Sequence, residues 1–212
     1  MATSATVIVR GRASREVEPD YAVISTAIEA TAAEQHDAMR QVARIADDLR
    51  DGIGATPGVR TFLLPQVRVQ RNQRWDERRQ TSIPTDWTAS VSGNVECARE
   101  AAGALVALIG GAGAQVMWVS WEVDRANPNH REVRREAVAD AVQAAEDFAA
   151  AVGRDLGPLL SLADEGLSSG SRDDSGPMLM RAAATAGGPQ IDLDPQPQVL
   201  SAAVEATFAL AE

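Results

Sequence analysis

The chain has few residues that could carry acid–base, metal or nucleophilic chemistry. Its only histidines, His36 and His130, lie far apart and do not form the HxH or HExxH spacing of a zinc site. Asp20, Glu29 and Glu122 could act as an acid and base only if the fold brought two of them together in a cleft. We therefore predict no catalytic residue, no metal ligand set and no cofactor, and we expect a protein that is not an enzyme.

Four aspartates are the other candidate metal ligands: Asp173, Asp174, Asp192 and Asp194. They lie in a stretch rich in Gly, Ser and Pro, and they lack the glycine and the distal glutamate of a calcium-binding loop. We interpret them as part of a solvated acidic loop. Long segments of this composition are usually mobile, so we predict a mobile loop over residues 165–197.

The single cysteine, Cys97, excludes an intramolecular disulfide, a cysteine-based metal cluster and a CxxC redox pair. Residues 87–97 alternate strictly between apolar and polar side chains, which predicts a strand with one buried face. Cys97 falls on that apolar face, so we favour inert packing over a redox role. Gly110-Gly111-Ala112-Gly113 follows a predicted helix, whereas a dinucleotide-binding turn follows a strand, and we interpret it as a helix terminator.

The densest group of interaction-prone side chains lies in the polar stretch from Gln70 to Pro84, where arginines surround a tryptophan. The group consists of Arg71, Arg74, Trp75, Arg78 and Arg79. We expect these residues at the tip of a hairpin, where charge and stacking could hold an anionic small molecule or an acidic protein. On a protein of net charge −10, such a cluster is more often simply a hairpin tip or the complement to an acidic patch on a neighbouring subunit.

Composition limits the partners and the compartment. The formal net charge is −10 and the isoelectric point is near 4.7, which disfavours nucleic acid because such binding needs basic residues to neutralise phosphates. No apolar run approaches the roughly 20 residues of a membrane span. Met1 to Arg15 lacks the apolar stretch of a secretory signal. We expect a cytoplasmic protein with no membrane partner.

Periodicity gives the expected elements. In order, they are strands near 6–9 and 22–30, a helix ending near 53, strands at 59–69 and 87–97, a helix at 98–109, a strand at 115–124, a helix from about 129 to 152, and strands at 156–163 and 200–210. The first two strands are joined by the charged turn Glu18-Pro19-Asp20. The order ββαββαβαββ predicts an α+β fold in which helices cover antiparallel sheets.

The long helix is predicted to bury one apolar stripe, formed by Val133, Ala137, Ala141, Ala144, Phe148 and Val152. The strand at 115–124 carries a tryptophan on each face. Trp118 shares one face with Val116, Ser120 and Glu122, and Trp121 shares the other with Met117, Val119 and Val123. One face must pack on helices, and we expect the other to meet another lobe or another subunit.

Three segments resemble the SIMPL-domain family. Val7 to Gly11 with Glu18-Pro19-Asp20 looks like the family's opening hairpin, Arg135 to Gly157 is similar to its alanine-rich helix and the following stretch, and Val199 to Leu210 is similar to its closing strand. The resemblance implies helices on antiparallel sheets, often as two intertwined lobes. It also implies ring-shaped or channel-shaped homo-oligomers in some members and links to stress tolerance in others. Familiar bacterial members carry a secretion signal, which is not found here, and the family has no established catalytic residues.

We therefore expect a single SIMPL-like domain over residues 5–211, with residues of about 59–124 as a candidate second lobe. The first functional hypothesis is a non-enzymatic homo-oligomer with a stress-related or scaffolding role. It would assemble through the second face of the Trp118 and Trp121 strand or through the arginine-bearing hairpin. The alternative is a binding module that holds an anionic small molecule or an acidic protein through Arg71 to Arg79.

Overall fold

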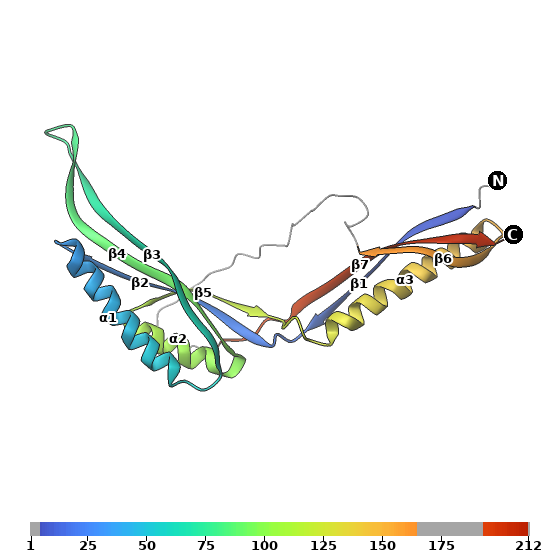
Figure 1. Ribbon diagram of the computed structural model, residues 1–212, viewed down its shortest axis with the longest axis horizontal. Coiled ribbons are helices and arrows are strands. Elements are labelled where there is room, and N and C mark those ends of the chain that lie inside the picture. Colours follow the sequence, from blue (N-terminus) through green and yellow to red (C-terminus); the bar gives the residue numbers. More distant parts are fainter. Residues whose placement is uncertain (1–4, 165–192, 212) are drawn as a thin grey trace. The chain divides into compact units, whose positions relative to one another are not determined.

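A computed structural model describes residues 5–164 and 193–211 (Figure 1). The elements follow the order ββαββαβαββ and the strands form two antiparallel sheets, so the predicted α+β fold is confirmed. The described residues divide into two compact units. The first unit contains residues 5–18, 123–164 and 197–211, and the second contains residues 19–122 and 193–196. Most of the predicted loop at 165–197 lies outside the described residues.

The first unit is a three-stranded sheet covered on one face by a helix. The strands β1 (Thr6–Val17), β7 (Gln198–Ala211) and β6 (Asp155–Asp164) lie in the order β1-β7-β6, and α3 (Asn129–Ala151) packs on them (Figure 1). The core of this unit lies between α3 and one face of β1 and β7. Its buried residues are Val9, Val204, Ala206, Phe208, Ala137, Ala141 and Ala145. The closing strand is central in its sheet, so its apolar row is covered.

Helix α3 lies very close to β1, and this changes the predicted stripe. The buried residues of α3 are Val133, Ala137, Ala141, Ala145 and Ala149, whereas Phe148 and Val152 are exposed. The prediction was wrong for the last two because the helix packs along a row of alanines four residues apart. Small side chains permit close approach, and Gly11 on β1 faces the middle of this row with no side chain at all.

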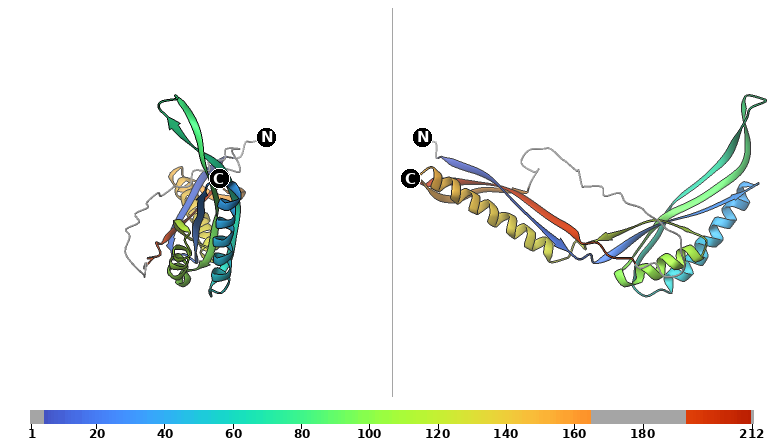
Figure 2. Two further views of the ribbon diagram at one scale, coloured as in Figure 1. Left: turned by 90° about the vertical axis from the view of Figure 1, so that its left-hand side faces the viewer. Right: turned by 180° about the vertical axis from the view of Figure 1, so that it is seen from behind.

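The second unit is a four-stranded sheet in the order β3-β4-β2-β5. Its elements are β2 (Tyr21–Ala32), α1 (Gln35–Gly54), β3 (Val59–Asp76), β4 (Thr81–Ala98), a 3₁₀ turn (Arg99–Ala101), α2 (Ala102–Gly111) and β5 (Gln115–Glu122). Both helices cover the same face of the sheet (Figure 2). The core between them contains Ile24, Ile28, Leu49, Val95, Leu105 and Ile109, all fully buried.

The start of α1 does not use the capping-box spacing that its sequence offers. Thr31 and Glu34 have that spacing, but Thr31 is the penultimate residue of β2 and its hydroxyl lies 3.0 Å from that of Thr88 on β4. Glu34 is the N-cap residue and makes no side-chain capping bond. The buried stripe of α1 begins at Ala38, and Met39 is exposed. The alternation predicted for β4 is confirmed, with Cys97 on the buried face.

The predicted opening hairpin is wrong. All of β1, from Thr6 to Val17, pairs with β7, whereas β2 pairs with β4 on one side and β5 on the other. Both sides of β2 are therefore occupied, and no side is left for β1. Turn-forming residues between two strands show where the chain breaks, but they do not decide which strands become partners.

Candidate interaction surfaces

The arginine cluster lies on a two-stranded ribbon that extends beyond the rest of its sheet (Figure 1). Strand β2 ends where Ala32 pairs with Trp87, whereas the pairing of β3 with β4 continues to Asp76 and Thr81. Residues 72–86, which we call the ribbon, therefore have no third strand beside them among the described residues. The hairpin was predicted, but its length beyond the sheet follows only from where β2 stops.

The turn of the ribbon is held by a carboxylate. One oxygen of Asp76 accepts hydrogen bonds from the backbone N–H groups of Arg78 and Arg79 at 2.9 and 3.3 Å, and its other oxygen lies 3.9 Å from Nε of Arg79. Gln80 completes the turn with a φ of 52°, in the left-handed region. The side chains of Arg74 and Arg78 make no ion pair or hydrogen bond within the described part of the chain.

The base of the ribbon is anchored by polar and stacking contacts. Asn72 donates hydrogen bonds to Asp86 at 3.0 Å and to the Thr88 hydroxyl at 2.7 Å. Hydrogen bonds from Asn72 and from the Thr85 hydroxyl lower the pKa of Asp86 below its usual value, so this carboxyl stays ionised at neutral pH. The guanidinium of Arg71 lies 5.6 Å from the ring centroid of Trp87.

Acidic residues close to the arginine cluster lower its net charge. Between residues 71 and 86, four arginines are accompanied by Asp76, Glu77 and Asp86. The ribbon itself therefore has no net charge and Arg71 at its base adds one positive charge, although the whole chain is strongly acidic. The exposed ring of Trp75 adds an apolar surface between the charged groups. Such a mixture fits a protein surface better than a simple anion.

The second candidate surface lies on the edge strand β5. Its pairing with β2 shifts between Ser25 and Thr26, because Met117 is an extra residue in β5. The Thr26 hydroxyl donates to the carbonyl of Gln115 at 3.0 Å, next to this bulge. Val116 consequently packs against the core together with Val119 and Trp121. The predicted faces were therefore wrong for Val116, because a bulge reverses the alternation.

The bulge leaves Met117 and Trp118 exposed, and we call these two residues the β5 surface. Trp118 pairs with Ser25 and is 58% exposed, and Met117 is about half exposed. The two tryptophans of the strand have different environments. Trp121 packs against the core and holds β5 to it, whereas the side chain of Trp118 projects from the same strand into solvent.

Of the three candidate carboxylate residues, Asp20 and Glu122 are neighbours, because the backbone N–H of Asp20 donates to the Glu122 carbonyl at 2.8 Å, and the Glu122 side chain is exposed. His36 is exposed, with Nε2 at 3.4 Å from Oδ1 of Asp37. Glu29 and Glu122 lie far apart, because Glu122 pairs with Tyr21 and eight residues of strand, about 26 Å, separate Tyr21 from Glu29. No group of three His, Cys, Asp or Glu side chains within the described ranges could hold a metal ion. Asp173, Asp174 and Asp192 lie outside those ranges.

Cys97 is fully buried in the core of the second unit. Burial raises the pKa of its thiol to about 11, although the nearby Arg60 acts in the opposite direction. The reactive thiolate is therefore scarce at neutral pH, and the side chain acts in packing.

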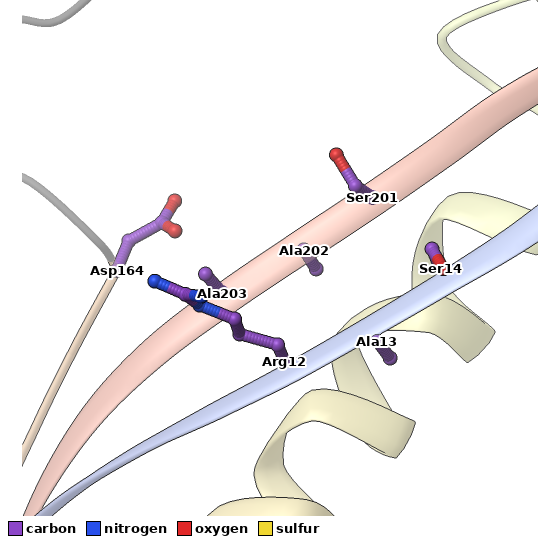
Figure 3. Close-up of a pocket in the computed structure, with 7 residues that line it drawn as sticks. All are labelled: Arg12, Ala13, Ser14, Asp164, Ser201, Ala202 and Ala203. Carbon is purple, nitrogen blue, oxygen red and sulfur yellow. The ribbon is translucent and has the colours of Figure 1, made fainter.

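Sequence reasoning did not find the hollow on the open face of the first unit (Figure 3). It has a volume of about 550 Å³ and is lined by Arg12, Ala13, Ser14, Asp164, Ser201, Ala202 and Ala203. In Figure 3, the Arg12 side chain extends past Ala203 toward the Asp164 carboxylate. The lining residues come from three strands that are distant in sequence, so no local motif could reveal them.

Comparison with known families gives a match that covers nearly the whole chain. Residues 7–208 match a family described as SIMPL, protein of unknown function (DUF541). No curated protein matches the chain. None of the helices within the described residues is long and apolar enough to cross a membrane.

Proposed function

The chain belongs to the SIMPL family, whose function is unknown, and on that premise we propose that it is a non-enzymatic protein that forms homo-oligomers through the β5 surface. The observation that carries the proposal is the exposure of Trp118 on an edge strand. A large aromatic side chain in that position has no covering element within the described part of its unit.

Three properties suit the β5 surface to a protein partner. Tryptophan is among the residues that contribute most to binding when an interface buries them. Val119 and Trp121 hold the strand against the core, so little conformational entropy is lost when Trp118 is covered. Small-molecule sites are concave, whereas an edge strand carrying one projecting ring is not. A second copy offers the same edge and the same ring, as a two-fold interface requires.

Replacing Trp118 with alanine should weaken association through β5 about 30-fold, because loss of a central aromatic residue typically costs about 2 kcal/mol of binding. Light scattering coupled to size-exclusion chromatography, over a concentration series, measures the change in mass. Trp75→Ala is the matched control, because Trp75 is 56% exposed and Trp118 is 58% exposed. A wild-type protein that stays monomeric at about 100 μM would contradict the proposal, and so would equal effects of the two substitutions.

A second function is favoured by the ribbon, which could bind an acidic protein surface. Arg74 and Arg78 lie beyond the end of β2 and have no charged partner among the described residues. Their guanidinium groups are therefore available to carboxylates of another molecule. The fixed turn at Asp76 keeps these groups on a defined scaffold.

Poly-L-glutamate is a suitable probe for this second function. Replacing Arg74, Arg78 and Arg79 together with glutamine should reduce its binding at least tenfold at low salt, with little change in melting temperature, because exposed ion pairs contribute little to stability. The matched control replaces three exposed arginines of α1, Arg40, Arg44 and Arg50, and changes the net charge equally. Equal losses in both variants would show that only net charge matters, and the ribbon would then have no specific role.

A further inference from the structure

One strand edge in the first unit is unusually regular. The two described sheets have four edge strands, of which β3, β5 and β6 all show register shifts, and β3 and β6 also contain Pro65 and Pro158. Bulges and prolines protect an edge against pairing with another chain. β1 has neither, and its 12 residues pair with β7 without interruption.

Two hydrogen bonds show which backbone groups of β1 face outward. The carbonyl of Ala5 accepts a bond from the N–H of Leu210 on β7, at 2.8 Å, whereas the N–H of Arg12 donates to Asp140 on α3, at 2.9 Å. Alternate residues of a strand point to opposite sides, so Thr6 and Ile8 direct their N–H and C=O groups away from β7. Asp140 closes the edge at Arg12, and as far as the described residues go only the first part of β1 stays open.

Helix α3 places apolar side chains beside that open part. Glu136, Asp140, Ala144 and Phe148 are spaced four residues apart and form one ridge of α3, and Val152 follows directly after the end of the helix. Glu136 pairs with Arg15, and Asp140 bonds to Arg12, so the ridge follows β1 in the antiparallel direction.

The two elements can be aligned by length. Eight helical residues from Asp140 to Phe148 span about 12 Å, and four strand residues from Arg12 to Ile8 span about 13 Å. Phe148 is therefore level with Ile8. The open edge is bordered by Ile8 on one face of the sheet, 65% exposed, and by Phe148 on the helix-covered face, 60% exposed.

We propose that a second copy of the chain adds its β1 to this edge, antiparallel and across a two-fold axis at Ile8. The result is a continuous six-stranded sheet in the order β6-β7-β1-β1-β7-β6. The inference rests on the proposed self-association, but it uses a surface in the other unit and does not depend on Trp118.

The edge is self-complementary in this register. Ile8 faces Ile8 of the second copy and exchanges N–H···O=C bonds with it, Thr6 comes opposite Arg10, and no like charges lie directly opposite. The contact is limited to one strand edge and two apolar side chains. Interfaces of about 1,000 Å² or less in total are small and usually weak, so we expect a dimer of micromolar affinity.

A cysteine at the two-fold axis tests the register directly. Residues that face each other in a hydrogen-bonded antiparallel pair have Cα atoms about 5.5 Å apart, which suits a disulfide. Ile8→Cys should form a disulfide-linked dimer under mild oxidation. Ser14→Cys, on the same face of β1 but beyond the closed position at Arg12, should not. The native Cys97 is buried and does not interfere. Equal cross-linking of both variants would overturn the proposal.

Mass measurements separate this edge from the β5 surface. In a Trp118→Ala background, association should persist, and adding Ile8→Lys or Phe148→Ser should weaken it at least tenfold. Val199→Lys is the matched control, because Val199 is 64% exposed and lies on the central strand β7. A Trp118→Ala protein that is strictly monomeric would overturn the β1 dimer and leave the β5 surface intact. Loss of association with Ile8→Lys alone, but not with Trp118→Ala, would support the β1 dimer and contradict the β5 surface.

Discussion

Replacing Gly11 with alanine should destabilise the first unit by about 3–5 kcal/mol, enough to unfold it under mild conditions. A β-carbon at this position would lie 2.0 Å from the Ala137 carbonyl oxygen, 2.5 Å from the Ala141 nitrogen and 2.7 Å from the Ala141 β-carbon. Two of these three atoms belong to the backbone of α3, so no side chain can move aside. The helix would have to lift from β1, and the core around Val9 would open.

Hydrogen exchange followed by mass spectrometry, combined with urea unfolding, measures this effect. Amides of β1, β7 and α3 should lose protection, whereas those of the second unit should keep it. Gly110→Ala is the control, because Gly110 lies in α2 and an added β-carbon meets nothing within 4 Å. That variant should be neutral or more stable by about 0.5–1 kcal/mol. A cost for Gly11→Ala below about 1 kcal/mol would contradict the close packing of α3.

Replacing Gly93 with alanine should detach β3 from β4 in the second unit, at a similar cost of about 3–4 kcal/mol. Its β-carbon would lie 1.9 Å from the carbonyl oxygen of Leu63 and 2.8 Å from the Leu64 α-carbon. The register of β3 shifts between Leu63 and Gln66, and the shifted backbone passes directly over Gly93. The ribbon is formed by the ends of β3 and β4, so its position depends on this close contact between the β3 backbone and Gly93.

Hydrogen exchange should locate this defect in residues 59–76, with protection of α3 and β7 unchanged. Gly54→Ala is the control in the same unit, because Gly54 ends α1 and an added β-carbon meets nothing within 4 Å. Unchanged protection of β3 in the Gly93→Ala protein would show that the bulge can relax, and the crossing would then not be a rigid feature.

Much of the candidate site chemistry was predictable because it depends on neighbours in sequence. The alternation through β4 places Cys97 on the buried face whatever its strand partners are, and the spacing of the histidines excludes a common zinc motif. The arginine hairpin was predictable for the same reason. Its weak net charge was visible in the sequence, but the role of Asp76 in holding the turn appears only in the folded backbone.

Other predictions failed where packing overrides a local pattern. The periodicity of α3 predicts that Phe148 is buried. In the structure, the alanine row packs against Gly11 on β1, because small residues on both elements permit close contact, and Phe148 is left exposed. Likewise, strict alternation in β5 predicts that Val116 lies on the same face as Trp118. The bulge at Met117 shifts the alternation by one residue, so Val116 lies on the opposite face. For α3 the deciding residue lies on another element, whereas for β5 it is an extra residue within the strand itself.

The sequence by itself determined the order of the elements, the α+β class and the burial of Cys97, because each follows from short-range periodicity in hydrophobic residues. Only the tertiary structure decided that β1 pairs with β7, that the ribbon extends beyond the end of β2, and that Phe148 stays exposed. The physical reason is that hydrogen bonding between strands is the same for any sequence. Side-chain packing between segments that are far apart along the chain therefore decides which strands pair and in which register.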